Sequence, residues 1–157
     1  MMGVLNALKL SLSLPSKKAV FQLNRVKTKD FFLYILCLHI FLGLPGAVKM
    51  LIDFISKDEM DGSFLLGATL YPFLIVTFGI VGISLLATLG LLIRTVTKRR
   101  LVYQLLWKMT MYASTMPILL YTVFDLFGSV NWLVNSLLFC WFLFTFTRMI
   151  LVYPRMK

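Results

Sequence analysis

The chain has 157 residues, of which 60% are hydrophobic and only 14% are charged. A water-soluble domain is usually about half apolar with roughly a quarter of its residues charged, and one small core could not bury this much apolar surface. The net charge of +10 would suit nucleic acid in a soluble protein. Here, however, the basic residues gather at the ends of apolar runs, which favours membrane lipids as the partner and argues against nucleic acid. The composition therefore predicts an all-α integral membrane protein.

The first thirty residues are too polar to span a membrane, and they place apolar side chains at helical spacing among basic ones. Basic amphipathic helices of this kind lie in the membrane interface. We therefore expect residues 1–30 to form a cytoplasmic interfacial helical segment, with packing on the protein's own helices as the alternative. Pro15 is expected to begin a helix, because proline fits the first helical turn after an extended residue.

Four stretches of largely apolar residues follow, each long enough for a helix that crosses a bilayer. We expect four transmembrane helices at about residues 31–50, 70–93, 108–127 and 130–152. Together with the first segment they would form a single membrane domain over residues 1–157. Gly43 and Pro45 predict a kink in the first span or an early end of it.

The basic residues are distributed unevenly around these spans. Most of them lie in residues 1–30, 94–108 and 148–157, whereas acids outnumber lysines in the connection between the first two spans. By the positive-inside rule, both termini and the 94–108 loop are cytoplasmic, in agreement with an even number of spans. Cationic clusters beside a span attract anionic lipid headgroups or an acidic partner surface. The candidates for such a contact are Lys17, Lys18, Lys98, Arg99 and Arg100.

Two residues of the expected third span can each be interpreted in two ways. Asp125 lies either inside the helix bundle, where a carboxylate marks a site, or at the hydrated outer interface. Pro117 removes a backbone donor in the middle of the span, which marks either a hinge or notch for a partner helix or a fixed kink. Lys49 and Asp53, four residues apart in the first connection, are expected to form a weak surface ion pair.

Small residues line one side of the expected second span and favour close packing against another helix of the chain. They are Gly79, Gly82, Ala87 and Gly90. His39, the single histidine, is interpreted as a hydrogen-bond partner between helices. A small homo-oligomeric transporter or channel would need these helices to enclose a water-filled path. Its polar lining would be His39, Ser114, Thr115, Asn135 and Ser136.

The sequence contains no recognisable catalytic, metal-binding or phosphate-binding motif. It has no paired carboxylates, no Cys and His spacing of a metal site, no nucleophile beside a base and no phosphate-binding glycine loop. We therefore expect no catalytic residue, no metal, no cofactor and no enzymatic activity.

Two stretches resemble a family of small Bacillota membrane proteins of unknown function, some of which are labelled maltodextrin-utilisation (MalA-like) proteins. In the opening stretch the matches are Leu14, Pro15, Lys17, Lys18, Phe21, Leu44 and Pro45. In the stretch "KRRLVYQLLWKMTMYASTMPILLYTVFDLF" the matches are Arg99, Arg100, Leu101, Tyr103, Trp107, Tyr112, Ala113, Thr115, Pro117 and Asp125. The family usually carries a large extracytoplasmic insert between spans one and two, which this chain lacks.

The family is similar to the wider Yip1-like group of multispan proteins, whose bacterial members occur beside ABC-type transporters. The resemblance therefore implies a non-enzymatic accessory or assembly subunit of a complex in the bacterial cell membrane, with an ABC-type transporter as the first expected partner. The apolar spans would dock against helices of this second integral membrane protein. The candidate residues for that contact are Trp107, Tyr112, Thr115, Pro117 and Asp125.

Overall fold

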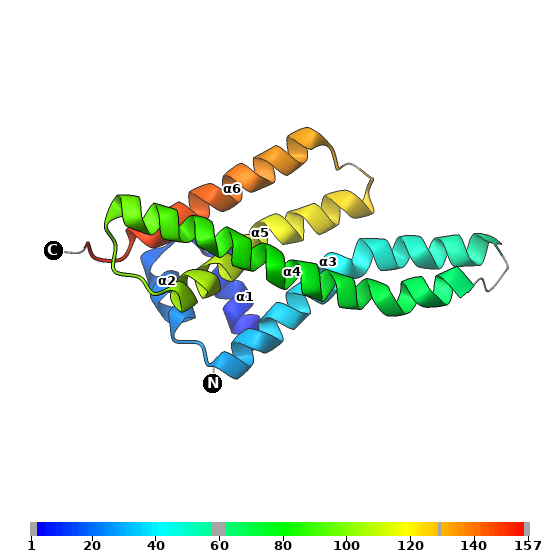
Figure 1. Ribbon diagram of the computed structural model, residues 1–157, viewed down its shortest axis with the longest axis horizontal. Helices are drawn as coiled ribbons and strands as arrows, with labels where there is room; N and C mark the ends of the chain where they lie inside the picture. The colour runs from blue at the N-terminus through cyan, green and yellow to red at the C-terminus, as the bar shows by residue number, and fades with distance from the viewer. Residues whose placement is uncertain (1–2, 58–61, 129, 156–157) are drawn as a thin grey trace.

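The computed structural model describes residues 3–57, 62–128 and 130–155, and in these ranges the chain is helical, without a β-strand (Figure 1). The helices are α1 (Val4–Leu12), α2 (Lys17–Asn24), α3 (Thr28–Lys57), α4 (Gly62–Thr97), α5 (Tyr103–Leu126) and α6 (Trp132–Leu151). The four long helices form two consecutive hairpins, α3 with α4 and α5 with α6. Both described chain ends lie toward the end of the bundle that also holds the connection between α4 and α5.

Three helices in the described ranges, and not the expected four, are long and apolar enough to cross a membrane. These stretches are Thr28–Ser56, Leu66–Thr97 and Trp132–Leu151. The expected span at 108–127 corresponds to α5, which is long enough but carries three threonines, three tyrosines and a serine. α5 packs against α3, α4 and α6 and also against α1 and α2. Protein rather than lipid therefore covers much of its surface, so a sequence this polar is tolerated at its position.

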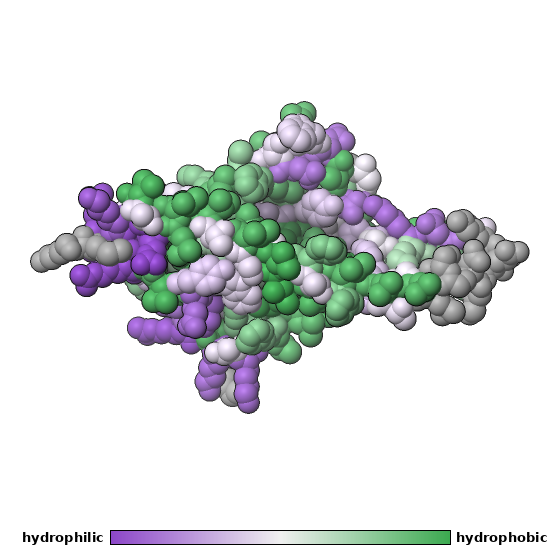
Figure 2. All heavy atoms as spheres, viewed as in Figure 1, coloured by the Kyte–Doolittle hydropathy of each residue, from purple (hydrophilic) through white to green (hydrophobic). Residues whose placement is uncertain are grey.

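The surface of the bundle agrees with a membrane protein. Large apolar side chains stand exposed along the long helices, among them Phe73, Phe78, Leu85 and Leu137. Figure 2 shows this hydrophobic surface over the middle of the molecule, with hydrophilic residues gathered toward its ends. A soluble monomer rarely exposes so continuous an apolar surface, whereas lipid tails solvate it without cost.

The first two long helices run past the expected bounds. α3 does not end at Pro45 but continues to Lys57, and Figure 1 shows it changing direction midway. The lost backbone hydrogen bond at a proline accounts for such a bend. α4 begins at Gly62 rather than near residue 70. With 30 and 36 residues, these helices measure about 45 and 54 Å, more than the roughly 30 Å hydrocarbon core.

The N-terminal helices pack on the bundle itself. α1 lies against α3 and α5, with Ala7 and Ser11 buried, and α2 buries Val20 and Leu23 against the same core. This arrangement matches the second of the two alternatives for the segment. The expectation that Pro15 begins a helix is wrong: α2 begins two residues later, because the Ser16 side chain caps it by accepting from the Ala19 N–H at 3.4 Å.

Candidate functional site

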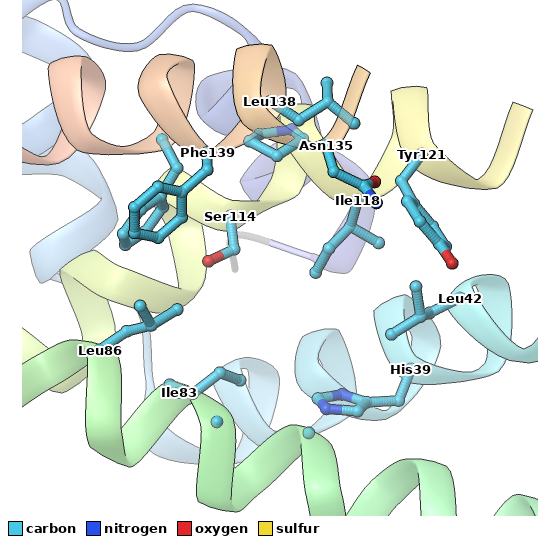
Figure 3. Close-up of a pocket in the computed structure, with 14 residues that line it drawn as sticks. His39, Leu42, Ile83, Leu86, Ser114, Ile118, Tyr121, Asn135, Leu138 and Phe139 are labelled. Carbon is cyan, nitrogen blue, oxygen red and sulfur yellow. The ribbon is translucent and has the colours of Figure 1, made fainter. Parts of the chain in front are cut away.

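A groove of about 320 Å³ lies between the two hairpins and is lined by all four long helices. Figure 3 shows His39 and Ile83 facing Ser114, Ile118 and Asn135 across it. Most of the lining is aliphatic or aromatic. The groove is therefore an apolar recess with a few polar groups, and it resembles a helix contact more than a water channel.

His39 supplies the most deeply buried polar side chain of the groove. Its Nδ1 donates to the carbonyl oxygen of Ile35, one turn earlier in α3, at 2.8 Å. The opposite edge of the ring lies against Gly79 of α4, where any Cβ would overlap the imidazole. His39 therefore packs between α3 and α4, but its hydrogen bond stays within α3 and does not join two helices as predicted.

Gly82, one turn along α4 from Gly79, meets open space. A Cβ built there has no atom within 4 Å, and Gly82 lines the groove. Ala87 is buried and Gly90 faces Phe146 and Leu106 of the same chain. The small-residue side of α4 is thus used internally, except at Gly82.

Ser114 and Pro117 are among the four residues that α5 brings to the groove. Ser114 is buried and donates to the Thr110 carbonyl of its own helix at 2.8 Å. Pro117 lies inside α5 and also lines the groove. A proline leaves the carbonyl four residues earlier, that of Ala113, without its helical N–H partner. Pro117 thus lies where α5 faces the recess between the hairpins, and the choice between a notch for a partner helix and a fixed kink stays a prediction.

The hairpins are joined by an ion pair near the far end of α5. Lys49 Nζ of α3 lies 2.8 Å from Asp125 Oδ1. The expected pair between Lys49 and Asp53 is wrong, because the cross-helix carboxylate takes the ammonium group instead. The Asp125 side chain is 23% exposed and the Lys49 side chain 59% exposed. Asp125 thus lies at the helix ends, partly covered, rather than in the middle of the bundle.

The other candidate residues for a partner contact lie on another face of α5. Thr115 is fully buried and makes a close hydrogen-bond contact with Tyr34, whose hydroxyl donates to Ser11 of α1 at 3.1 Å. Tyr112 is also buried, with its ring centroid 5.3 Å from that of Tyr34. Trp107 donates its indole N–H to the Ser84 hydroxyl of α4 at 3.2 Å. These three residues hold α5 to its neighbours within the chain.

The polar residues that a transporter or channel would need along a water-filled path also lie in two different places. His39, Ser114 and Asn135 line the groove, whereas Thr115 is committed to the contact with α1 and α3. Ser136 does not line it. Tyr121, which sequence reasoning did not select, also lines the groove, one turn beyond Pro117. Only the spacing of Ser114, Pro117 and Tyr121 along one helix face could have indicated it.

The cationic candidates occupy two elements at the end opposite the ion pair. Lys17 and Lys18 are exposed in the first turn of α2. Lys98, Arg99 and Arg100 form the connection between α4 and α5, where an isolated antiparallel bridge pairs Arg99 with Arg155. Sequence reasoning did not place Arg155 in this group, because the bridge joins segments far apart in the chain. Burial raises the pKa of the neighbouring Tyr153, so its phenol stays neutral near pH 7.

Within the residues that the structure describes, no group of three or more His, Cys, Asp or Glu side chains could hold a metal ion. A comparison with known families matches residues 49–152, about two-thirds of the chain, to the family described as "Protein of unknown function (DUF1189)". The chain belongs to the DUF1189 family. Neither a curated protein nor a solved structure matches it.

The DUF1189 match includes α4, α5 and α6 and therefore the groove walls from these helices. It contains the second stretch that carried the sequence resemblance, whereas all of the opening stretch, whose last match is Pro45, lies before it. The resemblance also pointed to a family of unknown function, and the DUF1189 match agrees with it to that extent. The comparisons name neither the MalA-like nor the Yip1-like group, so these two labels stay predictions from the resemblance.

Proposed function

We propose that this DUF1189 protein is a non-enzymatic accessory or assembly subunit of a bacterial membrane complex, which holds a transmembrane helix of its partner in the groove between the two hairpins. An ABC-type transporter is the partner to which the sequence resemblance points. The groove is the observation that carries the proposal, because it combines apolar walls with a few polar groups inside the expected membrane region.

The groove suits a helix better than a lipid tail. Gly82 has open space around it, so the backbone of a second helix can approach α4 closely there. Ser114 and Asn135 lie at the groove and can exchange hydrogen bonds with polar side chains of that helix. An acyl chain would use neither feature.

We propose a topology with four spans: the three apolar helices α3, α4 and α6, and in addition α5. Of the four, α5 is the one most covered by other helices of the chain. Its burial by α3, α4 and α6 supports this, because the polar residues of α5 then need not face lipid. Both termini and the connection between α4 and α5 are then cytoplasmic, as the basic residues favour. α1 and α2 would pack on the bundle at the cytoplasmic interface.

Purification of the tagged full-length protein in mild detergent tests the proposal, with Gly82→Leu as the decisive variant. The wild type should retain an integral membrane protein in a fixed ratio. Leucine at position 82 should release it, since a Cβ there has no atom within 4 Å and the rest of the side chain extends into the groove. Leucine also favours a helix more than glycine does, so the variant should fold.

Thr88→Leu is the matched control, because Thr88 is exposed on α4 and does not line the groove. It should leave the complex intact. A partner retained equally by wild type, Gly82→Leu and Thr88→Leu would contradict docking in the groove.

A small homo-oligomeric transporter or channel is the second candidate, favoured by one observation. His39, Ser114 and Asn135 come from three helices and line the same groove. This function predicts a homo-oligomer without a second protein, and solute flux in proteoliposomes that falls in Asn135→Leu. Absence of flux from a reconstituted, folded protein would contradict it.

A further inference from the structure

We propose that the connection between α4 and α5 and the C-terminal segment together form a binding site for the phosphate of an anionic lipid headgroup. The site is centred on Arg99, Arg100 and Arg155. It lies at the opposite end of α5 from the Lys49–Asp125 pair. It does not depend on the docking groove, and either proposal can fail without the other.

Backbone contacts bring the three arginines together. Arg99 and Arg155 face each other in the antiparallel bridge, and the Arg100 N–H donates to the Pro154 carbonyl at 3.4 Å. The Arg99 guanidinium also donates through Nη1 to the Tyr153 carbonyl. Residues more than fifty positions apart in the chain are thereby held at one place.

Like charges held this closely repel one another unless an anion joins them. Among the described residues, no carboxylate forms an ion pair with any of these arginines. Arg99 Nε is buried and has no hydrogen-bond partner. A guanidinium offers forked donors that match the oxygens of a phosphate, so a phosphate at the exposed Arg100 and Arg155 side chains would offset the charge of the cluster.

The surroundings favour a lipid over free phosphate. Leu92 and Val96 in the last turns of α4 are 65% and 83% exposed, and Val102, next to Arg100 and Leu101, is 68% exposed. Soluble phosphate gains nothing from apolar neighbours, whereas a phospholipid places its acyl chains on them while its headgroup meets the arginines. Figure 2 shows hydrophilic residues at this end beside the hydrophobic surface of the helices.

Thermal unfolding of the purified full-length protein in an uncharged detergent tests the site. Added phosphatidylglycerol should raise the melting temperature, and phosphatidylcholine or inorganic phosphate at equal concentration should not. Arg155→Gln and Arg100→Gln should each raise the apparent Kd for phosphatidylglycerol about tenfold, the effect of losing one charge-assisted bond. Arg99→Lys keeps the charge but loses the fork, and it should weaken binding as well.

Arg148→Gln is the control, because Arg148 is an exposed cation in the last turn of α6 outside the bridge. It should bind phosphatidylglycerol like the wild type. Equal losses in Arg148→Gln and Arg155→Gln would show that the lipid senses only net charge and would overturn the site. Equal stabilisation by inorganic phosphate would overturn the assignment to a lipid. Melting curves without lipid identify any variant that is unfolded, and the remaining variants then decide.

Discussion

At the scale of single residues, Gly79 and Gly82 provide the sharpest comparison in the protein. They lie on the same side of α4, one turn apart, yet one meets the His39 ring and the other meets open space. A methyl group at position 79 must displace a buried imidazole that is already bonded to Ile35. The same methyl group at position 82 displaces nothing.

We therefore predict that Gly79→Ala destabilises the protein by about 1–3 kcal/mol, the usual cost of overpacking a tight contact. Gly82→Ala should leave stability unchanged or raise it slightly, because alanine favours a helix. Unfolding in detergent, followed by circular dichroism, measures both. Equal stability of the two variants would show that His39 does not lie against Gly79.

The ion pair between Lys49 and Asp125 is a second contact between single residues, and it joins α3 to α5. Lys49→Asp and Asp125→Lys should each lower the melting temperature, because each places two like charges side by side. The double exchange should recover much of the loss, since it restores opposite charges. If the double variant loses as much melting temperature as the sum of the losses in the two single variants, the two side chains do not interact.

At the scale of the elements, α1 is held to the bundle by the contacts of Tyr34 with Ser11 and Thr115. Tyr34→Phe removes both hydrogen bonds and keeps the ring that packs on Tyr112. We predict a loss of about 1–3 kcal/mol, since two buried hydrogen bonds are lost, although the Ser11 and Thr115 hydroxyls keep their bonds to carbonyl groups of their own helices. Hydrogen exchange of α1 amides should rise by more than that of α6. A uniform increase along the chain would contradict a specific link to α1.

The sequence predicted these elements in part, and the differences have physical reasons. Apolar runs identified the regions of the long helices, since they need only composition and length. They did not locate the ends of α3 and α4, because a helix continues through Pro45 and Pro72 when neighbouring helices support it. The sequence predicts the region of α5 as one of four similar spans, whereas packing against five other helices lets α5 be more polar than the three apolar ones.

The candidate site was less predictable than the helices. Proline chemistry selected Pro117, and small size selected Gly82, and both line the groove. A local rule of four-residue spacing assigned Lys49 to Asp53, but its partner is 76 positions away. Likewise, the bridge of Arg99 to Arg155 depends on how the C-terminal segment folds back. Such long-range pairs follow from the arrangement of helices, which composition and spacing do not contain.

At the scale of the whole molecule, two hairpins share one core near the chain termini and are tied again by the ion pair farther along. Between these points lies the groove, which is the one feature on which the proposed function depends. Residues Leu137 and Leu138 of α6 provide a direct probe of it. They are adjacent, but Leu138 lines the groove and Leu137 is an exposed side chain outside it.

The most direct test places a photoreactive amino acid at position 138 or at position 137 in the living cell. After illumination, position 138 should form a crosslink to one integral membrane protein, and position 137 should give little of that product. Gly82→Leu should abolish the crosslink from position 138, because it fills the same recess. The same crosslinks from both positions, or products with lipid alone at position 138, would contradict a partner helix in the groove.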